Sequence, residues 1–252
     1  MKLSSRAGLA ELMDAPGLDP AIYERCLRDL NRVNRVTLTH RPTLRWLSHA
    51  TRHLAPGASF SLLDIAYGHG DLLRLIARWA VRRGLRATLT GIDLNPRAAA
   101  AAYAVTPPDT QIDYRTGDVF AFAPGQPFDY IVTSQFTHHL PDADIIRLLR
   151  WMETNAAISW HVADLHRHWF AYYGFPLLAR LLRWHPIVRH DGAASIACAF
   201  TRGDWEQLLD QAGLQADITW HPGFRYSVAR RKVGRWVRVT RLTRLRSRRQ
   251  RS

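Results

Sequence analysis

The most informative segment of the chain is Leu62-Leu63-Asp64-Ile65-Ala66-Tyr67-Gly68-His69-Gly70-Asp71. It includes the end of a short apolar run, which predicts a buried strand, and it leads into the helical pattern of residues 72–83. Glycines at such a junction let a ligand approach the backbone, and N–H groups at the helix start can face a carboxylate. Doubly wound sheets bind ligands at the carboxyl ends of their strands. We therefore predict a binding site here, in which Asp64 can receive an ammonium group.

Strand and helix patterns alternate along the rest of this region. Strands are predicted at 60–66, 87–92, 111–115, 128–134 and 157–163, and helices at 72–83, 96–103, 142–152 and 201–212. This alternation implies parallel strands joined by right-handed crossovers. Residues 215–220 and 224–229 could add a closing antiparallel pair. We predict an α/β fold with a Rossmann-like, mostly parallel seven-stranded sheet, N-terminal helices and a helical lid insertion.

The chain divides into three predicted parts. Residues 1–57 are expected to form an N-terminal helical cap, in which Asp19-Pro20 supplies the N-cap and first residue of a helix. Residues 58–229 are expected to form the Rossmann-like core. A segment within it at about 166–192, rich in aromatic residues and histidines, is the predicted lid insertion. Residues 230–252 form a basic tail.

The net charge of +14 comes mainly from the C-terminal end of the chain. From Arg225 to Ser252 there are twelve Arg or Lys residues and no acidic residue, which leaves 23 basic and 21 acidic residues elsewhere. A nearly neutral body is not typical of a nucleic-acid-binding protein, so nucleic acid is not an expected partner. The tail itself could lie on an anionic membrane, grip RNA or remain a solvated end.

We expect a cytoplasmic protein, with membrane association through the tail as an option. The N-terminus has no apolar stretch typical of a secretory signal. The most apolar segment, 170–182, is too short to span a bilayer. Cys26 and Cys198 lack the spacing of a metal or redox pair, which favours a reducing compartment.

Polar residues follow the next three predicted strands. Asp93 ends the second strand, where its carboxylate can accept hydrogen bonds from both hydroxyls of a ribose. Asp118 follows the third strand and can accept from an adenine amino group. The fourth strand leads to His138 and His139, where a histidine could take a proton from a hydroxyl group. We prefer His139 as this catalytic base, because it lies closer to the predicted helix entry at Leu140-Pro141.

These residues, in this order, resemble the class I S-adenosylmethionine-dependent methyltransferases over about residues 60–215. The resemblance implies S-adenosylmethionine as the cofactor, and the cofactor-binding positions are Asp64, Ala66, Gly68, Gly70, Asp93, Leu94, Asp118 and Val119. Ala66 stands where the family usually has glycine. No metal ion is expected, because the candidate ligands His161, Asp164, His166 and His168 span the end of a strand and need not converge.

A finer resemblance concerns the acceptor. Residues 163–167, 190–192 and 199–201 are similar to segments of bacterial methyltransferases from quinone, phenolic-lipid and polyketide pathways. This resemblance implies a small aromatic, phenolic, polyketide-type or lipid-like acceptor, methylated at a hydroxyl or at a ring carbon. The implied acceptor-binding residues are Arg41, Asp164, Arg167, His190 and Asp191.

Three other interpretations remain open. A dinucleotide site would need the pattern G-x-G-x-x-G, and the chain offers only Gly68-x-Gly70. An RNA methyltransferase would use the Arg-rich tail on phosphates, and its RNA affinity would depend steeply on salt. A non-catalytic, cofactor-binding scaffold protein is compatible with Ala66 and would bind the cofactor without turnover.

Overall fold

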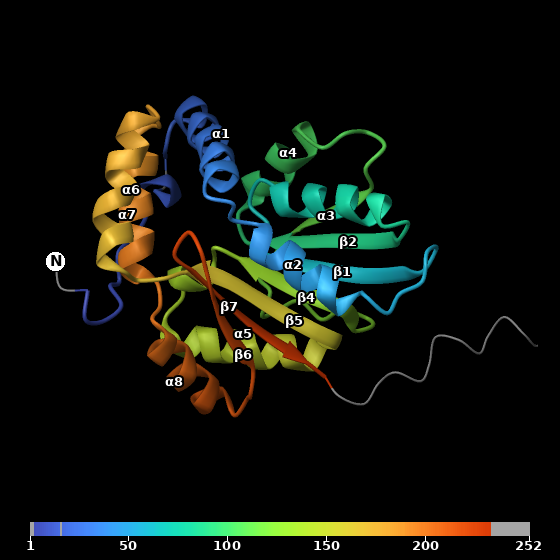
Figure 1. The fold of residues 1–252 in the computed structure, drawn as a ribbon. Helices are drawn as coiled ribbons and strands as arrows, with labels where there is room; N and C mark the ends of the chain where they lie inside the picture. The colour runs from blue at the N-terminus through green and yellow to red at the C-terminus, as the bar shows by residue number, and fades with distance from the viewer. Residues whose placement is uncertain (1–2, 16, 233–252) are drawn as a thin grey trace, which may run out of the picture.

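The computed structural model describes residues 3–15 and 17–232, so most of the predicted basic tail lies outside the described residues. Figure 1 shows a central sheet with helices on both faces and a pair of helices beside one end of it. The strands lie in the order β3-β2-β1-β4-β5-β7-β6. Their bounds are β1 (Ser59–Ile65), β2 (Arg86–Asp93), β3 (Ile112–Thr116), β4 (Phe128–Ser134), β5 (Ala156–Leu165), β6 (Asp217–His221) and β7 (Arg225–Arg231).

The sheet is parallel except at one strand. Strands β1 to β5 pair in parallel, and β7 runs antiparallel to both of its neighbours, β5 and β6. The strand order reverses between β1 and β4, which is the topological switch point where open α/β sheets bind ligands. The predicted Rossmann-like, mostly parallel seven-stranded sheet is confirmed.

Two layers of helices bury both faces of the sheet. One layer contains α2 (Arg41–Ala50), α3 (Asp71–Arg82) and α4 (Pro96–Ala104), and the other contains α5 (Asp142–Asn155) and α8 (Arg202–Ala212). Neighbouring side chains of β1 point to opposite faces of the sheet. Leu62 packs against the layer of α2, α3 and α4, and Leu63 and Ile65 pack against the layer of α5 and α8. Burial on both faces explains why the neighbouring residues Leu62 and Leu63, which point to opposite faces, are both apolar.

The N-terminal cap leads into the sheet. It begins with a single 3-10 turn, η1 (Leu12–Asp14), followed by α1 (Pro20–Val36). The Asp19 side chain accepts hydrogen bonds from the backbone N–H groups of Ala21 and Ile22, so the predicted N-cap of α1 is confirmed.

The lid consists of α6 (Trp169–Leu181) and α7 (Pro186–Cys198), which pack on each other and, through α7, on α1 (Figure 1). A small apolar core joins the three helices and contains Cys26, Val33, Ala179, Trp184 and Val188. The predicted lid ended near residue 192, whereas α7 continues to Cys198 because residues 194–198 are buried. Among the described residues, no helix combines the length and apolar character needed to cross a bilayer.

Candidate active site

The loop between β1 and α3 has three residues with left-handed backbone. Ala66, Gly68 and Gly70 have φ angles of 58°, 54° and 71°. A Cβ atom on Gly70 would also lie only 2.5 Å from the Tyr114 hydroxyl, so this position requires glycine on two grounds. Alanine in the left-handed region costs about 1 kcal/mol. This cost explains why a glycine is expected at position 66.

Asp64 lies near the end of β1 and is 2% exposed. Burial raises the pKa of its carboxyl group well above the ordinary range, and the carboxylates of Asp71 and Asp93 raise it further. A cationic ligand group beside Asp64 would stabilise the ionised carboxylate. The end of β1 is therefore suited to an ammonium group.

Two further acidic residues stand at neighbouring strand ends. Asp93 ends β2, where its Oδ2 accepts from the Gly68 N–H at 2.8 Å and its Oδ1 from the Asn95 N–H at 2.9 Å. Burial raises the pKa of Asp93, although these two bonds act in the opposite direction. Asp118 is exposed after β3, and its Oδ1 accepts from the Phe120 N–H at 2.9 Å. Both carboxylates retain lone pairs that can accept from ligand hydroxyl or amino groups.

Asp71 connects this loop to the N-terminal cap. Its Oδ2 lies 2.7 Å from His40 Nε2 and accepts a hydrogen bond from Asn34 Nδ2 at 3.0 Å. Burial acts to raise the pKa of Asp71, but His40, Asn34 and Arg74 together outweigh burial, so this pKa lies below its usual value. The first residue of α3 is thus held by α1 and by the turn between α1 and α2.

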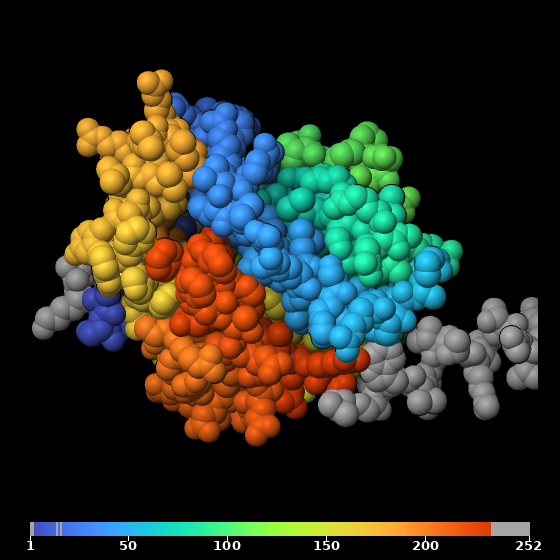
Figure 2. All heavy atoms as spheres, viewed as in Figure 1, coloured from blue at the N-terminus to red at the C-terminus, as the bar shows by residue number. Residues whose placement is uncertain are grey.

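A cavity of about 810 Å³ lies between the lid, α1, the loop after β4 and the turn between β6 and β7. We call it the lid cavity, and Figure 2 shows a hollow where the lid, α1 and this turn meet. Its lining is mostly apolar and includes Leu30, Val33, Leu165, Phe170, Leu178 and Ile196. Its polar lining includes Glu11, Gln135, His138, His139 and Asp191. Such a lining suits a small apolar molecule that carries a polar group.

His138 is a buried residue of η2 (Thr137–His139) and is bonded to Asp164. Its Nδ1 lies 2.6 Å from Asp164 Oδ1, and its backbone N–H donates to Asp164 Oδ2 at 3.1 Å. An ionised carboxylate only accepts, so we assign the shared proton to Nδ1, and Nε2 faces Glu11. Burial acts to lower the pKa of His138, but the carboxylates of Asp164 and Glu11 outweigh burial and raise this pKa.

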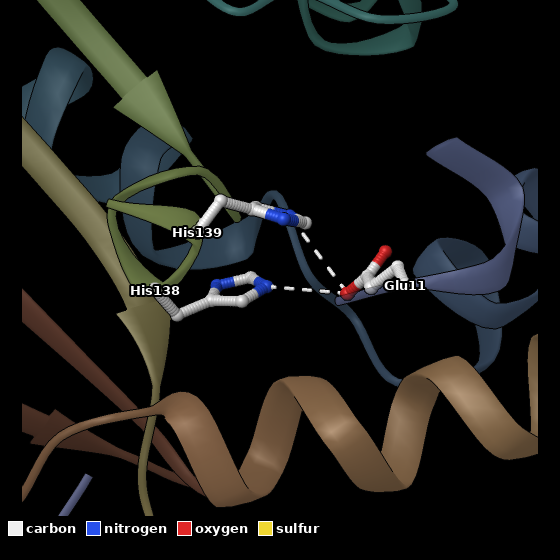
Figure 3. Close-up of side chains that lie close together, drawn as sticks. All are labelled: Glu11, His138 and His139. Atoms are coloured by element: carbon white, nitrogen blue, oxygen red, sulfur yellow. Dashed lines mark ion pairs between the residues drawn. The ribbon is translucent and has the colours of Figure 1, made fainter. Parts of the chain in front are cut away.

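The carboxylate of Glu11 faces both histidines (Figure 3). Its Oε1 lies 3.7 Å from His138 Nε2 and 3.8 Å from His139 Nε2. Ser195 of α7 donates a hydrogen bond to the same oxygen. Burial acts to raise the pKa of Glu11, but the histidines outweigh burial and lower it. Glu11 could not be found from the sequence, because the residues before Asp19 carry no periodic pattern or motif.

Comparison with known proteins identifies the family. A family model described as a methyltransferase domain matches residues 38–217. The chain belongs to this family. The resemblance to class I methyltransferases, drawn from the loop after β1 and the acidic residues at the strand ends, is thereby confirmed.

Individual methyltransferases are similar in part of the sequence or in fold. Trans-aconitate 2-methyltransferase of Streptomyces avermitilis is 35% identical over 96 residues, which are 36% of this chain. The matched region spans about a third, 34%, of that curated relative. The plantazolicin methyltransferase BpumL, in complex with S-adenosylhomocysteine and a triazolic desmethylPZN analog, has a TM-score of 0.68 at 16% identity, over 85% of this chain and 92% of its own. Magnesium protoporphyrin IX methyltransferase (ChlM) from Synechocystis PCC 6803, with bound S-adenosylhomocysteine, has a TM-score of 0.54 at 15% identity, over 87% and 91%. At these identities the two structures show a shared methyltransferase fold.

In this methyltransferase-domain protein, the predicted acceptor residues of α7 hold the N-terminal segment against the lid. Asp191 lines the lid cavity, and its carboxylate accepts from the backbone N–H groups of Leu12 and Met13 at 2.9 and 3.0 Å. The neighbouring His190 places its Nδ1 3.0 Å from Asp191 and is largely exposed. Asp191 therefore helps to shape the wall of the cavity.

The other predicted acceptor residues of this methyltransferase-domain protein lie elsewhere. Asp164 is fully buried beneath His138, and Arg167 is buried in an ion pair with Asp204 at 3.0 Å. Neither belongs to the described residues that line the lid cavity. Arg41 lines a separate cavity of about 770 Å³ between α1, α2 and α3. The geometry thus gives Asp164 a way to act through His138, and it gives Arg167 a structural ion pair.

Proposed function

We propose that the protein transfers a methyl group from S-adenosylmethionine to a hydroxyl oxygen of a small aromatic or lipid-like acceptor bound in the lid cavity. The observation that carries this proposal is the row of acidic residues at the ends of β1, β2 and β3, together with an apolar cavity after the neighbouring strand β4 that two histidines line. The alternative reaction at this site is methylation of an activated ring carbon in an acceptor of the same class.

The residues present fit the cofactor. The buried Asp64 carboxylate would receive the ammonium of the methionyl part, and Asp93 would accept from the ribose hydroxyls. Asp118 would accept from the adenine amino group, and the exposed Leu94 and buried Val119 would flank the ring. When bound, S-adenosylmethionine supplies an activated methyl group together with its own leaving group. The protein's task is therefore to position the acceptor and to exclude water.

The histidines stand where an acceptor hydroxyl would lose its proton. The His139 side chain is 32% exposed and lines the lid cavity, whereas that of His138 is 4% exposed and is fixed by Asp164. We assign proton removal to His139, which the acceptor reaches directly, and His138 lies beside it as the second candidate that the sequence offered. The apolar lining supports an aromatic or lipid-like acceptor over RNA, whose charged backbone it would leave unpaired.

The first test is calorimetric titration of S-adenosylmethionine and S-adenosylhomocysteine into the native chain and Asp93→Ala. We expect micromolar binding to the native chain. Loss of hydrogen bonds to a charged acceptor is worth about 1.5–3 kcal/mol, so affinity should fall on the order of 10- to 100-fold in the variant. Asp113→Ala, on the exposed face of β3, is the matched control and should bind as the native chain does.

Asp93 also accepts from two backbone N–H groups, so Asp93→Asn provides a second variant that can hold the loop through its remaining carbonyl oxygen. A screen for S-adenosylhomocysteine formation with phenols and quinols then identifies the acceptor class. A folded native chain that binds neither compound at millimolar concentration would rule out the proposed cofactor. Binding without turnover on any hydroxylated aromatic compound would favour the non-catalytic scaffold.

A further inference from the structure

Three side chains of the lid cavity converge on one point. Glu11, His138 and His139 each offer a ligand atom, and the three atoms all lie within 4.8 Å of one another. Figure 3 shows the two imidazoles on η2 facing the Glu11 carboxylate, which comes from the segment before η1. The group therefore joins the core of the fold to the N-terminal segment.

The surroundings of His138 match those of a metal-bound histidine. Histidine ligands of metal ions almost always donate their second ring N–H to a carboxylate, a carbonyl or water, which fixes the tautomer and the ring orientation. Here Asp164 Oδ1 lies 2.6 Å from His138 Nδ1, which leaves Nε2 on the side of Glu11. Thr137 and the Leu165 N–H also donate to Asp164, so the supporting carboxylate is itself held in place.

We propose that Glu11, His138 and His139 bind one divalent transition-metal ion, with further coordination positions open to the lid cavity. Two imidazoles and one carboxylate form the donor set of open zinc and non-haem iron sites. Tetrahedral ligands at about 2.0–2.2 Å from zinc lie roughly 3.4 Å from one another. The distances of 3.7 and 3.8 Å from Glu11 Oε1 to the two histidines would close by a few tenths of an ångström. The two histidine nitrogens lie within 4.8 Å of each other and would have to approach by up to about 1.4 Å, which requires a rotation of the partly exposed His139 side chain.

The role of such an ion rests on the proposed function. An acceptor hydroxyl bound at an open position would have a lower pKa and would release its proton to solvent. The oxygen could then form a bond to the methyl carbon as the carbon–sulfur bond breaks, which leaves S-adenosylhomocysteine. In this form of the mechanism the two histidines act through the ion instead of as free bases.

The test is titration of Zn²⁺, and of Co²⁺ followed by its visible absorption, into the full chain after treatment with a chelator. We expect one ion per chain and a micromolar or tighter dissociation constant. Glu11→Gln and His139→Ala should each weaken binding at least about tenfold, because even groups that only support a ligand contribute 10- to 100-fold. His49→Ala, on the exposed side of α2, is the control for surface histidines and should bind as the native chain does.

Titration of S-adenosylhomocysteine into every variant reports folding and separates the two proposals. Absent ion binding in a chain that still binds S-adenosylhomocysteine would overturn the metal site alone. Ion binding that Glu11→Gln and His139→Ala leave unchanged would overturn it as well. If Glu11→Gln fails to fold, His139→Ala decides the question, since the His139 side chain is partly exposed. Ion binding without S-adenosylhomocysteine binding would contradict the proposed function and leave the metal site standing.

A different observation concerns the outer face of the lid. The helix α6 carries a row of apolar side chains at four-residue spacing: Trp169, Tyr173, Leu177 and Leu181. This spacing places the four on one side of the helix, and they are between 62% and 76% exposed. Figure 1 shows α6 at the edge of the molecule, away from the sheet.

The charged residues of the sequence that contains α6 and the turn after it have one sign. The sequence from 165 to 190 contains four arginines and no Asp or Glu. Arg180, Arg183 and Arg189 are exposed. Aromatic residues and arginines beside an apolar helix face are typical of a helix that lies in the surface of an anionic bilayer.

We infer that this face of α6 docks on an anionic lipid surface. Phe170, Leu177 and Leu181 of the same helix also line the lid cavity, so a lipid-like molecule could pass from the bilayer into the cavity. The contact is peripheral, and it uses described residues of the lid in addition to any contribution of the basic tail.

Co-sedimentation of the full chain with vesicles tests this inference. We expect binding to vesicles of phosphatidylcholine and phosphatidylglycerol and little binding to phosphatidylcholine alone. The double variant Trp169→Ala with Tyr173→Ala should bind at least about tenfold more weakly, because each large apolar side chain contributes roughly 1.5–3 kcal/mol when buried. Val81→Ser removes an exposed apolar side chain on α3 and should have no effect. Equal vesicle binding by the double variant would overturn the inference, as would a dimer that the two substitutions dissociate without any vesicle binding.

Discussion

At the scale of single residues, His161 is the least satisfied polar side chain of the core. It is fully buried on β5, and neither ring nitrogen has a hydrogen-bond partner among the described residues. Its ring stacks on Trp46 of α2 with 4.8 Å between ring centroids. Burial lowers the pKa of His161 from 6.5 to about 3, and His221 contributes in the same direction. The folded protein therefore holds this imidazole neutral.

His161→Phe should stabilise the protein and reduce its sensitivity to acid. The substitution keeps the stacked ring and removes two unpaired polar atoms, so the free energy of unfolding at neutral pH should rise by about 1–3 kcal/mol. Between pH 6.5 and about 3 the unfolded chain binds a proton at His161 that the folded chain does not, so native stability falls as the pH drops through this window. Urea denaturation at pH 7 and pH 5 measures both effects. The exposed His49→Gln variant is the control, and its free energy of unfolding should fall between pH 7 and pH 5 by as much as that of the native chain. An equal fall in His161→Phe would contradict the attribution of this pH dependence to His161.

The places of residues in the fold could be predicted where they depend on local spacing. The positions of Asp64, Gly68, Gly70 and Asp93 follow from strand ends and from the turns that begin helices, which a short window of sequence encodes. Glu11 could not be predicted, because only the folded chain brings it to His138 and His139. The contact between Asp164 and His138 could not be predicted either, because the two residues lie on different segments that only the folded chain brings together.

At the scale of elements, the core strands and helices could be predicted because their signals are local. The predicted strand 128–134 coincides with β4, and the predicted helix 201–212 agrees with α8 to within one residue. A capping box at Thr201 and the left-handed Gly213 bound this helix. The far end of α7 could not be placed in the same way. The residues of its last turns are buried against segments that are distant in the sequence. For example, the Ala7 N–H donates a hydrogen bond to the Ala197 carbonyl at 3.0 Å.

Gly192→Ala should loosen the lid. A Cβ atom at Gly192 of α7 would lie 2.6 Å from Cζ of Phe175, so α6 and α7 would have to separate. Overpacking of this kind lowers the free energy of unfolding by about 1–3 kcal/mol. Gly174→Ala on α6 is the control, since the nearest atom would be 3.9 Å from its Cβ and alanine favours a helix by roughly 0.5–1 kcal/mol. Urea denaturation compares the two variants, and equal stability of Gly192→Ala and the native chain would show that Phe175 moves aside without loss.

At the scale of the whole molecule, the N-terminal segment fastens the lid to the core. Arg6 donates to the carbonyls of Cys198 in α7 and Leu140 after η2, at 3.0 and 2.9 Å, and forms an ion pair with Asp142. On the other side of the cavity, Arg225 of β7 donates to Thr37 between α1 and α2. These contacts surround the lid cavity, whereas the acidic residues of the cofactor site stand at the ends of β1, β2 and β3 and are not among the residues that line it. Acceptor binding and cofactor binding are therefore expected to be separable.

Deletion of residues 1–18 should separate them in practice. The deletion removes Glu11, the Arg6 contacts and the partners of Asp191, but it leaves Asp64, Asp93 and Asp118 in place. Affinity for S-adenosylhomocysteine should therefore stay within about threefold of native, which is less than 1 kcal/mol. Turnover of the acceptor found in the screen should fall on the order of 100-fold, because a misplaced acceptor loses the alignment that methyl transfer needs. Calorimetry and S-adenosylhomocysteine formation measure the two quantities on one preparation. Native turnover in the shortened chain would mean that the acceptor does not depend on the N-terminal wall of the cavity, and parallel loss of both would mean that this segment is needed for the fold itself.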